Sequence, residues 1–197
     1  LAVAAAAGAV QRRAWKTEAE VAVLYLLSCP SDGALDTAVL ADADALVIPG
    51  VGAFGVAMSN LSCFVDVIAG HVDCGKPLLG ICLGLQLLFE SSEETPGVNG
   101  LGFFEGSCKR FDLDSSFKIP HMGWNQIRVN DTSLNNVSIL EGADNKYMYF
   151  VHSYYVDPVC RDFVTAYCDY GMDVPVAVGR DNLFALQFHP EKSGKVG

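Results

Sequence analysis

The stretch "GICLGLQLLFE", residues 80–90, places a cysteine between two glycines where the periodicity of the sequence changes. Before the cysteine, residues 77–81 form a short apolar run that predicts a buried strand. After it, leucines recur at the spacing of a helix, at positions 83, 87 and 88. Cys82 therefore lies at a strand-to-helix corner in the pattern GxCxG, which is typical of a nucleophile elbow. Glycines let the backbone turn sharply, and the first turn of the helix favours a thiolate.

A buried small apolar residue is the other interpretation of this cysteine, because free cysteines are commonly interior. The composition does not decide between them, but it narrows the class of protein. The chain has 197 residues, of which 51% are hydrophobic and 18% charged, so we expect one compact domain spanning residues 1–197. Its net charge of −10 argues against nucleic acid and anionic membranes as partners. No run approaches the ~20 apolar residues of a membrane span.

The cysteines indicate a compartment. Seven of them occur at irregular spacing, and they form neither a disulfide framework nor a CxxC metal pattern. We therefore predict a cytoplasmic protein that holds no metal and needs no other cofactor.

The order of predicted elements indicates the fold class. Residues 2–15 are predicted as helix, 20–26 and 44–50 as strands, and 61–72 as helix, followed by the strand and helix of the elbow. This alternation predicts an α/β fold, with a central, mostly parallel sheet and helices on both faces. Later strand-like runs predict an antiparallel layer on the same core, at 101–111, 124–129, 146–156, 163–170, 175–180 and 183–189.

A thiol nucleophile needs a base and a group that orients the base. Of the four histidines, we expect His71 to be solvated on a helix and His152 to be a core or backbone-bonded histidine, while His121 has no acidic neighbour. His189 follows a predicted strand, and Glu191 lies two positions further on. If the backbone is extended there, both side chains project to one side, and the carboxylate can hold one tautomer of the imidazole. A surface ion pair at a strand end is the alternative.

The elbow and the HPE segment occur together with three further segments, and with them the chain resembles the class I, or triad, glutamine amidotransferases. Within that family it is similar to the glutaminase component of imidazole glycerol phosphate synthase, from histidine biosynthesis. The resemblance rests on "PGVGAF" (49–54), "GICLGLQLLFE" (80–90), "PHMGWN" (120–125), "YFVHSYY" (149–155) and "QFHPEKSG" (187–194). It implies a three-layer, flavodoxin-like fold. It also implies hydrolysis of L-glutamine to glutamate and ammonia, with delivery of ammonia to a barrel-shaped cyclase, either a separate subunit or a fused domain.

The resemblance assigns roles to residues. It makes Cys82 the nucleophile, His189 the general acid and base, and Glu191 its orienting partner. The oxyanion hole would come from the backbone of Leu83, Val51 and Gly52, and glutamine would be bound by Gly50, Gln86, Ser153 and Tyr154. The resemblance also puts three residues at the face that meets the synthase: Trp124, Asn125 and Lys192.

Two departures and two alternatives remain open at this point. Residues 11–41 match the family poorly, and members of the family begin with a buried strand and end with a closing helix that the sequence does not show, so we expect a chain clipped at both ends. Another class I glutaminase, such as one serving pyridoxal phosphate synthesis, is the nearest alternative enzyme. An inactive scaffold that keeps the fold and docks a partner is the alternative without catalysis.

Overall fold

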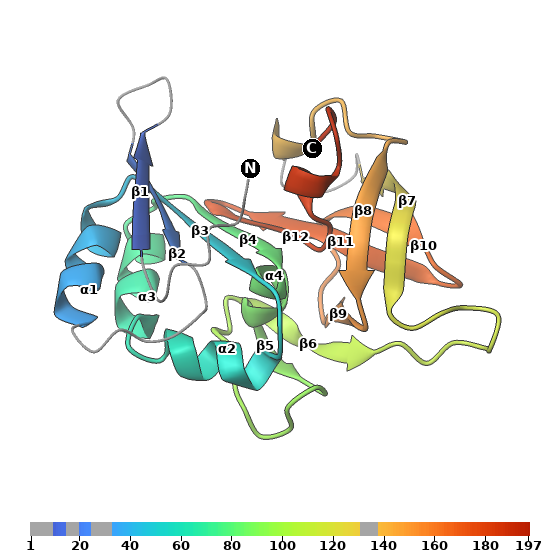
Figure 1. The fold of residues 1–197 in the computed structure, drawn as a ribbon, viewed down its shortest axis with the longest axis horizontal. Helices are drawn as coiled ribbons and strands as arrows, with labels where there is room; N and C mark the ends of the chain where they lie inside the picture. Colours follow the sequence, from blue (N-terminus) through green and yellow to red (C-terminus); the bar gives the residue numbers. More distant parts are fainter. Residues whose placement is uncertain (1–9, 15–19, 25–32, 131–137) are drawn as a thin grey trace.

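A nine-stranded mixed sheet forms the centre of the computed structural model, which describes residues 10–14, 20–24, 33–130 and 138–197 (Figure 1). The strand order is β1 (Val10–Ala14), β2 (Glu20–Leu24), β3 (Ala45–Gly50), β4 (Leu78–Cys82), β12 (Leu183–Leu186), β11 (Asp173–Arg180), β10 (Val164–Asp169), β7 (His121–Val129) and β8 (Tyr147–His152). Strands β2, β3, β4 and β12 run parallel, and all other neighbours pair antiparallel. Most of the predicted antiparallel strands therefore continue the parallel sheet, whereas the run at 101–111 and the end of the run at 146–156 lie in a second sheet.

Among the described residues, a second, three-stranded sheet and four helices pack on this centre. The second sheet has the order β5 (Phe89–Ser92), β6 (Phe104–Arg110) and β9 (Tyr154–Pro158). The helices are α1 (Gly33–Asp42), α2 (Phe54–Leu61), α3 (Val65–Asp73) and α4 (Leu83–Leu87), with 3-10 turns η1 (Ser138–Leu140) and η2 (Pro190–Lys192). The predicted α/β fold class is confirmed.

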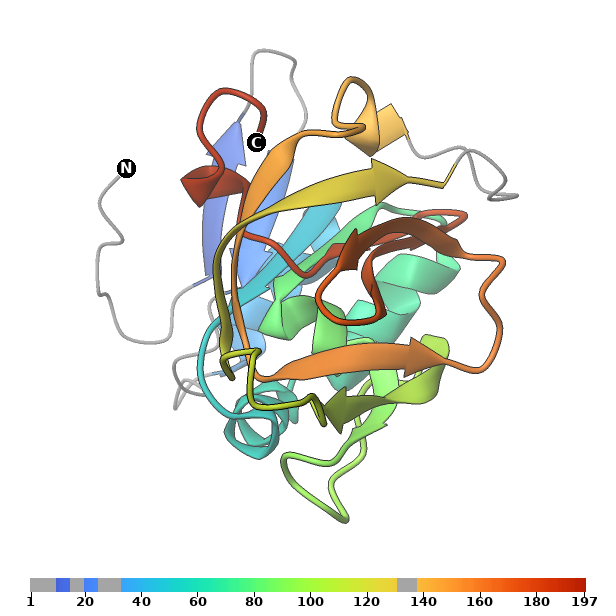
Figure 2. The same cartoon turned by 90° about the vertical axis from the view of Figure 1, so that its right-hand side faces the viewer.

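Burial alternates along the parallel strands, so each face of the sheet meets a different core. Leu46, Ile48 and Leu78 point into a first cluster, to which all four helices contribute. A second cluster lies among the antiparallel strands, around Ile127 and Phe150, and none of the four helices contributes to it. Figure 2 shows β7 and β8 curving across this end of the sheet. Within the described residues, the helices pack against the first cluster, and the antiparallel strands enclose the second.

The first predicted helix is wrong where the structure describes it. Residues 10–14 form β1, which pairs along the edge of β2, while the rest of the predicted segment 2–15 lies outside the described residues. Helix propensity is a weak preference, and hydrogen bonds to an open strand edge outweigh it here. The helix predicted at 61–72 is α3, and the sequence missed α1, α2 and β5. No single described helix is long and apolar enough to cross a membrane; α2 and α3 pass that test only as a pair bent by 80°.

The corner between β4 and α4 depends on its two glycines. A Cβ added at Gly80 would lie 2.7 Å from the carbonyl oxygen of Gly84, and a Cβ at Gly84 would overlap the carbonyl oxygen of Ile48 on β3. Backbone thus packs directly on backbone, which only glycine allows. Between them Cys82 has φ 55° and ψ −106°, a conformation that costs free energy for a residue with a side chain.

Gly84→Ala should lower the free energy of unfolding by about 1–3 kcal/mol, because the methyl group must push α4 away from β3. Gly70→Ala is the matched control, since a Cβ there has nothing within 4 Å and Gly70 lies inside α3. Its better helix propensity should raise the stability by up to about 1 kcal/mol. Urea denaturation followed by circular dichroism measures both changes. Equal effects of the two substitutions would show that the corner is not tightly packed.

Candidate active site

The two segments singled out in the sequence meet at one edge of the sheet. Strands β4 and β12 are parallel neighbours, with Ile81 opposite Leu186, so their carboxyl ends lie side by side. Cys82 ends β4, and Gln187 follows β12 and donates from Nε2 to the Cys82 Sγ at 3.8 Å. The chain then continues directly into His189 and η2. Functional groups of parallel α/β sheets gather at this carboxyl edge.

His189 and Glu191 form the predicted pair. The His189 Nδ1 lies 2.9 Å from the Glu191 Oε1, although the backbone turns through η2 instead of staying extended. A carboxylate can only accept, so Nδ1 carries a proton, and in the neutral form of the ring the lone pair is on Nε2. His189 is buried, and its Nε2 has no hydrogen-bond partner, so it is not bonded to the Cys82 thiol. Catalytic hydrogen bonds often form only once substrate is bound.

The backbone of His189 is fastened to β8. Its N–H donates to the carbonyl oxygen of Tyr149 at 2.9 Å. The hydroxyl of Ser193 donates to the carbonyl oxygen of His189 at 2.6 Å and accepts from the N–H of Tyr149 at 3.0 Å. Ser193 is buried and was not predicted as a site residue. It ties the backbone of His189 to β8 through one contact four residues back and another 44 residues away, and the second contact has no local sequence signal.

Burial dominates the acidity of the nucleophile. Burial raises the pKa of the Cys82 thiol to about 11. The backbone N–H of Leu83, which faces the sulfur, lowers this pKa, but by less than burial raises it. Lys192 also lowers this pKa and Glu191 raises it, which places the HPE turn within electrostatic reach of the thiol. The elbow pattern predicts a thiolate, whereas burial in the folded protein favours the neutral thiol. A base is therefore needed at neutral pH.

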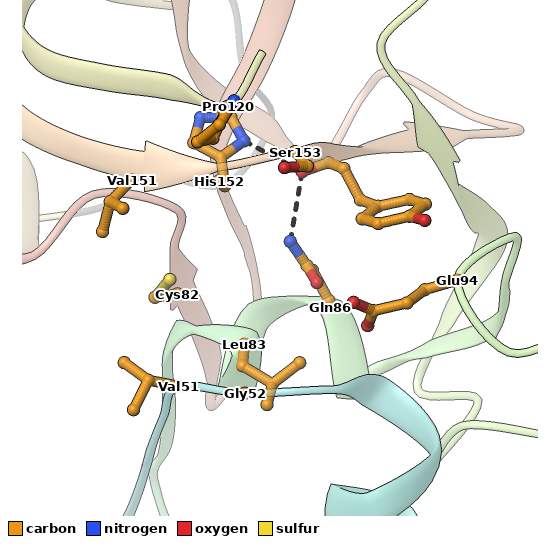
Figure 3. A pocket seen from close by; sticks show the side chains of 11 residues that line it. Val51, Gly52, Cys82, Leu83, Gln86, Glu94, Pro120, Val151, His152 and Ser153 are labelled. Carbon is orange, nitrogen blue, oxygen red and sulfur yellow. Dashed lines mark hydrogen bonds between the residues drawn. The ribbon is translucent and has the colours of Figure 1, made fainter.

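A cavity of about 320 Å³ opens over the thiol (Figure 3). It is lined by Val51, Gly52, Cys82, Leu83, Gln86, Glu94, Pro120, Val151, His152, Ser153 and Tyr154. The structure thus brings together every predicted oxyanion residue and three of the four predicted substrate contacts. The fourth, Gly50, pairs with Cys82 across β3 and β4.

Two hydrogen-bonding side chains organise the walls of this cavity. The Nε2 of Gln86 donates to the carbonyl oxygen of Tyr154 at 3.1 Å and to the Gln187 Oε1 at 3.2 Å, which leaves the Gln86 Oε1 as its acceptor. Glu94 was missed by sequence reasoning: its Oε2 accepts from the N–H of Phe54 at 2.7 Å and so fixes the start of α2 after the PGVGAF loop. That contact spans 40 residues, and nothing local to Glu94 signals it.

The predicted interface residues separate into two groups. Trp124 is 54% exposed, with its ring edge-on to Tyr149, and the Lys192 Nζ lies 5.8 Å from the same Tyr149 ring. Trp124 and Lys192 therefore share one surface. The side chain of Asn125 instead turns inward and donates to the carbonyl oxygen of Asp169 at 2.8 Å.

The other histidines and cysteines give a mixed outcome. The predicted backbone bond of His152 is confirmed, whereas His71 is buried and not solvated, with its Nε2 at 3.2 Å from the carbonyl oxygen of Pro77. Cys63 is disulfide-bonded, which the irregular spacing did not predict. The free thiols in the described part of the chain are Cys74, Cys82, Cys108, Cys160 and Cys168.

Comparison with known proteins identifies the class. The family model described as "Glutamine amidotransferase class-I" matches residues 7–197. A crystal structure of a glutamine amidotransferase has the same fold, with a TM-score of 0.58, 21% sequence identity, and coverage of 78% of this chain and 74% of that one. The chain belongs to the class-I glutamine amidotransferase family.

Its sequence relatives define the branch. The imidazole glycerol phosphate synthase subunit HisH of Methanothermobacter thermautotrophicus is 49% identical over 162 residues, which cover 82% of this chain and 78% of the relative. The HisH subunit of Geobacillus thermodenitrificans is 46% identical over 180 residues, which cover 88% and 83%. Within the class, this is a chain of the HisH type, an enzyme subunit.

Alkylation of Cys82 in the ligand-free protein should accelerate with pH up to about pH 11, because only the thiolate reacts and the raised pKa keeps it scarce below that. Rates would be measured with iodoacetamide and mass-spectrometric mapping of the Cys82 peptide. A small model thiol, whose rate levels off above its ordinary pKa of about 8.5, is the control. The same plateau for Cys82 would contradict the dominance of burial.

Proposed function

We propose that this chain hydrolyses L-glutamine to glutamate and ammonia and delivers the ammonia to the cyclase subunit of imidazole glycerol phosphate synthase. One observation supports this reaction most strongly. The strained, buried Cys82 lies at the same sheet edge as His189, whose Nδ1 is bonded to Glu191 and whose buried Nε2 has no partner. The HisH relatives support the proposal that this synthase receives the ammonia, because their name describes them as subunits of it. Ammonia would be used to make imidazole glycerol phosphate and an aminoimidazole carboxamide nucleotide.

The reaction runs in two halves through Cys82 and His189. The His189 Nε2 removes the thiol proton, and the thiolate attacks the side-chain amide carbon of glutamine. His189 returns the proton to the departing ammonia, which leaves a glutamyl thioester. Water, deprotonated by the same nitrogen, then hydrolyses the thioester to glutamate and restores the thiol. Glu191 keeps the proton on Nδ1 and stabilises the imidazolium formed in each half.

Both halves pass through an oxyanion, for which backbone donors are at hand. The N–H of Leu83 faces the sulfur, and Val51 and Gly52 line the same cavity. Gly52 has φ +115°, which lets the peptide beside it reorient. The Oε1 of Gln86, with the backbone of Gly50, Ser153 and Tyr154, would hold the amino-acid end of glutamine.

Trp124 and Lys192 would meet the cyclase, a barrel-shaped partner that is either a separate subunit or a fused domain. Asn125 would support that surface from beneath. The similarity to HisH subunits favours this acceptor over the alternative of pyridoxal phosphate synthesis. The assembled pair of His189 and Glu191 favours catalysis over an inactive scaffold. We expect the enzyme to work in the cytoplasm without metal or other cofactor, and without nucleic acid or membrane as a partner.

Cys82→Ala should reduce glutamate release at least ~10³-fold, because no other atom can carry the glutamyl group. Added ammonium salt should restore product formation by the synthase complex, since the cyclase needs only the amine. Glu191→Gln should have a milder effect, because nucleophile and base both remain. Cys74→Ala, at an exposed free thiol, is the control. Glutamate release and synthase product would be assayed side by side; undiminished glutamate release by Cys82→Ala would reject the proposal.

A further inference from the structure

Two buried histidines beside the cavity have no part in the steps above. His121 on β7 is 3% exposed and lies directly opposite His152 on β8, which is 5% exposed. The His121 Nδ1 is 3.1 Å from the His152 Nε2, so the two rings share one hydrogen bond. Burial lowers the pKa of His121 to about 4 and that of His152 to about 3, so both rings are neutral at pH 7. Each neutral ring has one donor and one acceptor.

The cavity end of this pair fixes which nitrogen of His152 carries the proton. The His152 Nδ1 lies 2.9 Å from the carbonyl oxygen of Tyr154. A carbonyl oxygen only accepts, so Nδ1 must be the protonated nitrogen and Nε2 must be the acceptor. The His121 Nδ1, which faces that Nε2, must then be the donor.

The contacts of Asn125 with His121 independently show that the His121 Nδ1 is the donor to His152. The Asn125 Oδ1 accepts from the N–H of Gln126 at 2.8 Å, and its Nδ2 donates to the carbonyl oxygen of Asp169 at 2.8 Å, so the amide has only one satisfactory orientation. In that orientation the Nδ2 also donates to the His121 Nε2, at 3.3 Å. That nitrogen is therefore an acceptor, and His121 carries its proton on Nδ1. All hydrogen bonds run from Asn125 through both rings to Tyr154.

This series of hydrogen bonds ends at the Tyr154 carbonyl, which helps to organise the cavity. The carbonyl oxygen of Tyr154 accepts from the His152 Nδ1 and from the Gln86 Nε2. Gln86 continues to Gln187, which reaches the Cys82 sulfur. The imidazole of His121 cannot easily turn, because it is stacked between Tyr170 and Phe150, with ring centroids 3.9 and 4.7 Å away.

We propose that His121 and His152 are positioning residues for the glutaminase reaction, which fix the Tyr154 carbonyl and through it the Gln86 amide in the glutamine pocket. Reversing either ring would bring two donors or two acceptors together in a buried site, which costs far more than a hydrogen bond lost to water. The role of His121 and His152 in glutamine hydrolysis rests on the proposed function. The donor-to-acceptor direction of these hydrogen bonds follows from the contacts alone.

Imidazole ¹⁵N NMR of the protein at pH 7 tests the direction without any assay of activity. His121 and His152 should both be Nδ1–H tautomers, although free neutral histidine prefers Nε2–H. His71 is the internal control, because its Nε2 faces the carbonyl of Pro77 and must carry the proton there. Assignment of each ring would come from His→Gln variants taken one at a time. An Nε2–H tautomer or an imidazolium at His121 or His152 would overturn the inference.

Steady-state kinetics with the synthase partner test the positioning role. His152→Leu removes the donor to Tyr154 and should raise KM for glutamine at least tenfold, with a smaller change in kcat. His152→Asn, whose amide nitrogen can replace Nδ1, should restore most of the affinity. The circular dichroism spectra of both variants and their co-elution with the partner on size-exclusion chromatography should match the wild type, which shows that they fold and bind the partner. Equal KM values for glutamine in the two variants would contradict the positioning role of His152. A wild-type complex without glutaminase activity would contradict the proposed function instead.

Discussion

The contact of α4 with the backbones of β3 and β4 determines where every reacting group lies. With no side chain at Gly80 or Gly84, the helix packs directly on the sheet, and the intervening Cys82 is forced to a positive φ at the carboxyl edge. The same edge receives the end of β12, so the HPE turn arrives beside the thiol. The strain at one residue is outweighed by the packing of the whole core, which allows the nucleophile to be held before substrate binds.

Burial has opposite consequences for the two kinds of group at this edge. It raises the pKa of the thiol, so Cys82 depends on His189 for activation. It lowers the pKa of His121 and His152, which remain neutral and can therefore have only one proton each. The low-dielectric surroundings make each unsatisfied polar atom costly, and the hydrogen bonds around the cavity consequently have one arrangement. Three buried side-chain atoms of the described residues have no hydrogen-bond partner, namely the His71 Nδ1, the Thr165 Oγ1 and the His189 Nε2, and the last of these is the atom that receives the thiol proton in the proposed reaction.

The sequence predicted the parts of this site that local patterns determine. The elbow at Cys82, the contact of His189 with Glu191, and the lining of the cavity by Gln86 all lie within short motifs. Glu94 and Ser193 were missed because their roles come from contacts 40 and 44 residues away along the chain. The acidity of the thiol was misjudged for a related reason, since burial depends on the assembled core. In the fold, the alternation of strands and helices identified the class, but pairing at the open edge of β2 made residues 10–14 a strand.

Covalent chemistry at Cys82 is the central claim, and rapid acid quenching tests it most directly. The complex with its synthase would be mixed with isotopically labelled glutamine, quenched within one turnover and digested at low pH, where thioesters survive. The mechanism predicts a glutamyl group on the peptide that contains Cys82, formed with release of one ammonia and lost again on a longer incubation. Turnover of glutamine with no label on that peptide, or with label on another residue, would contradict it.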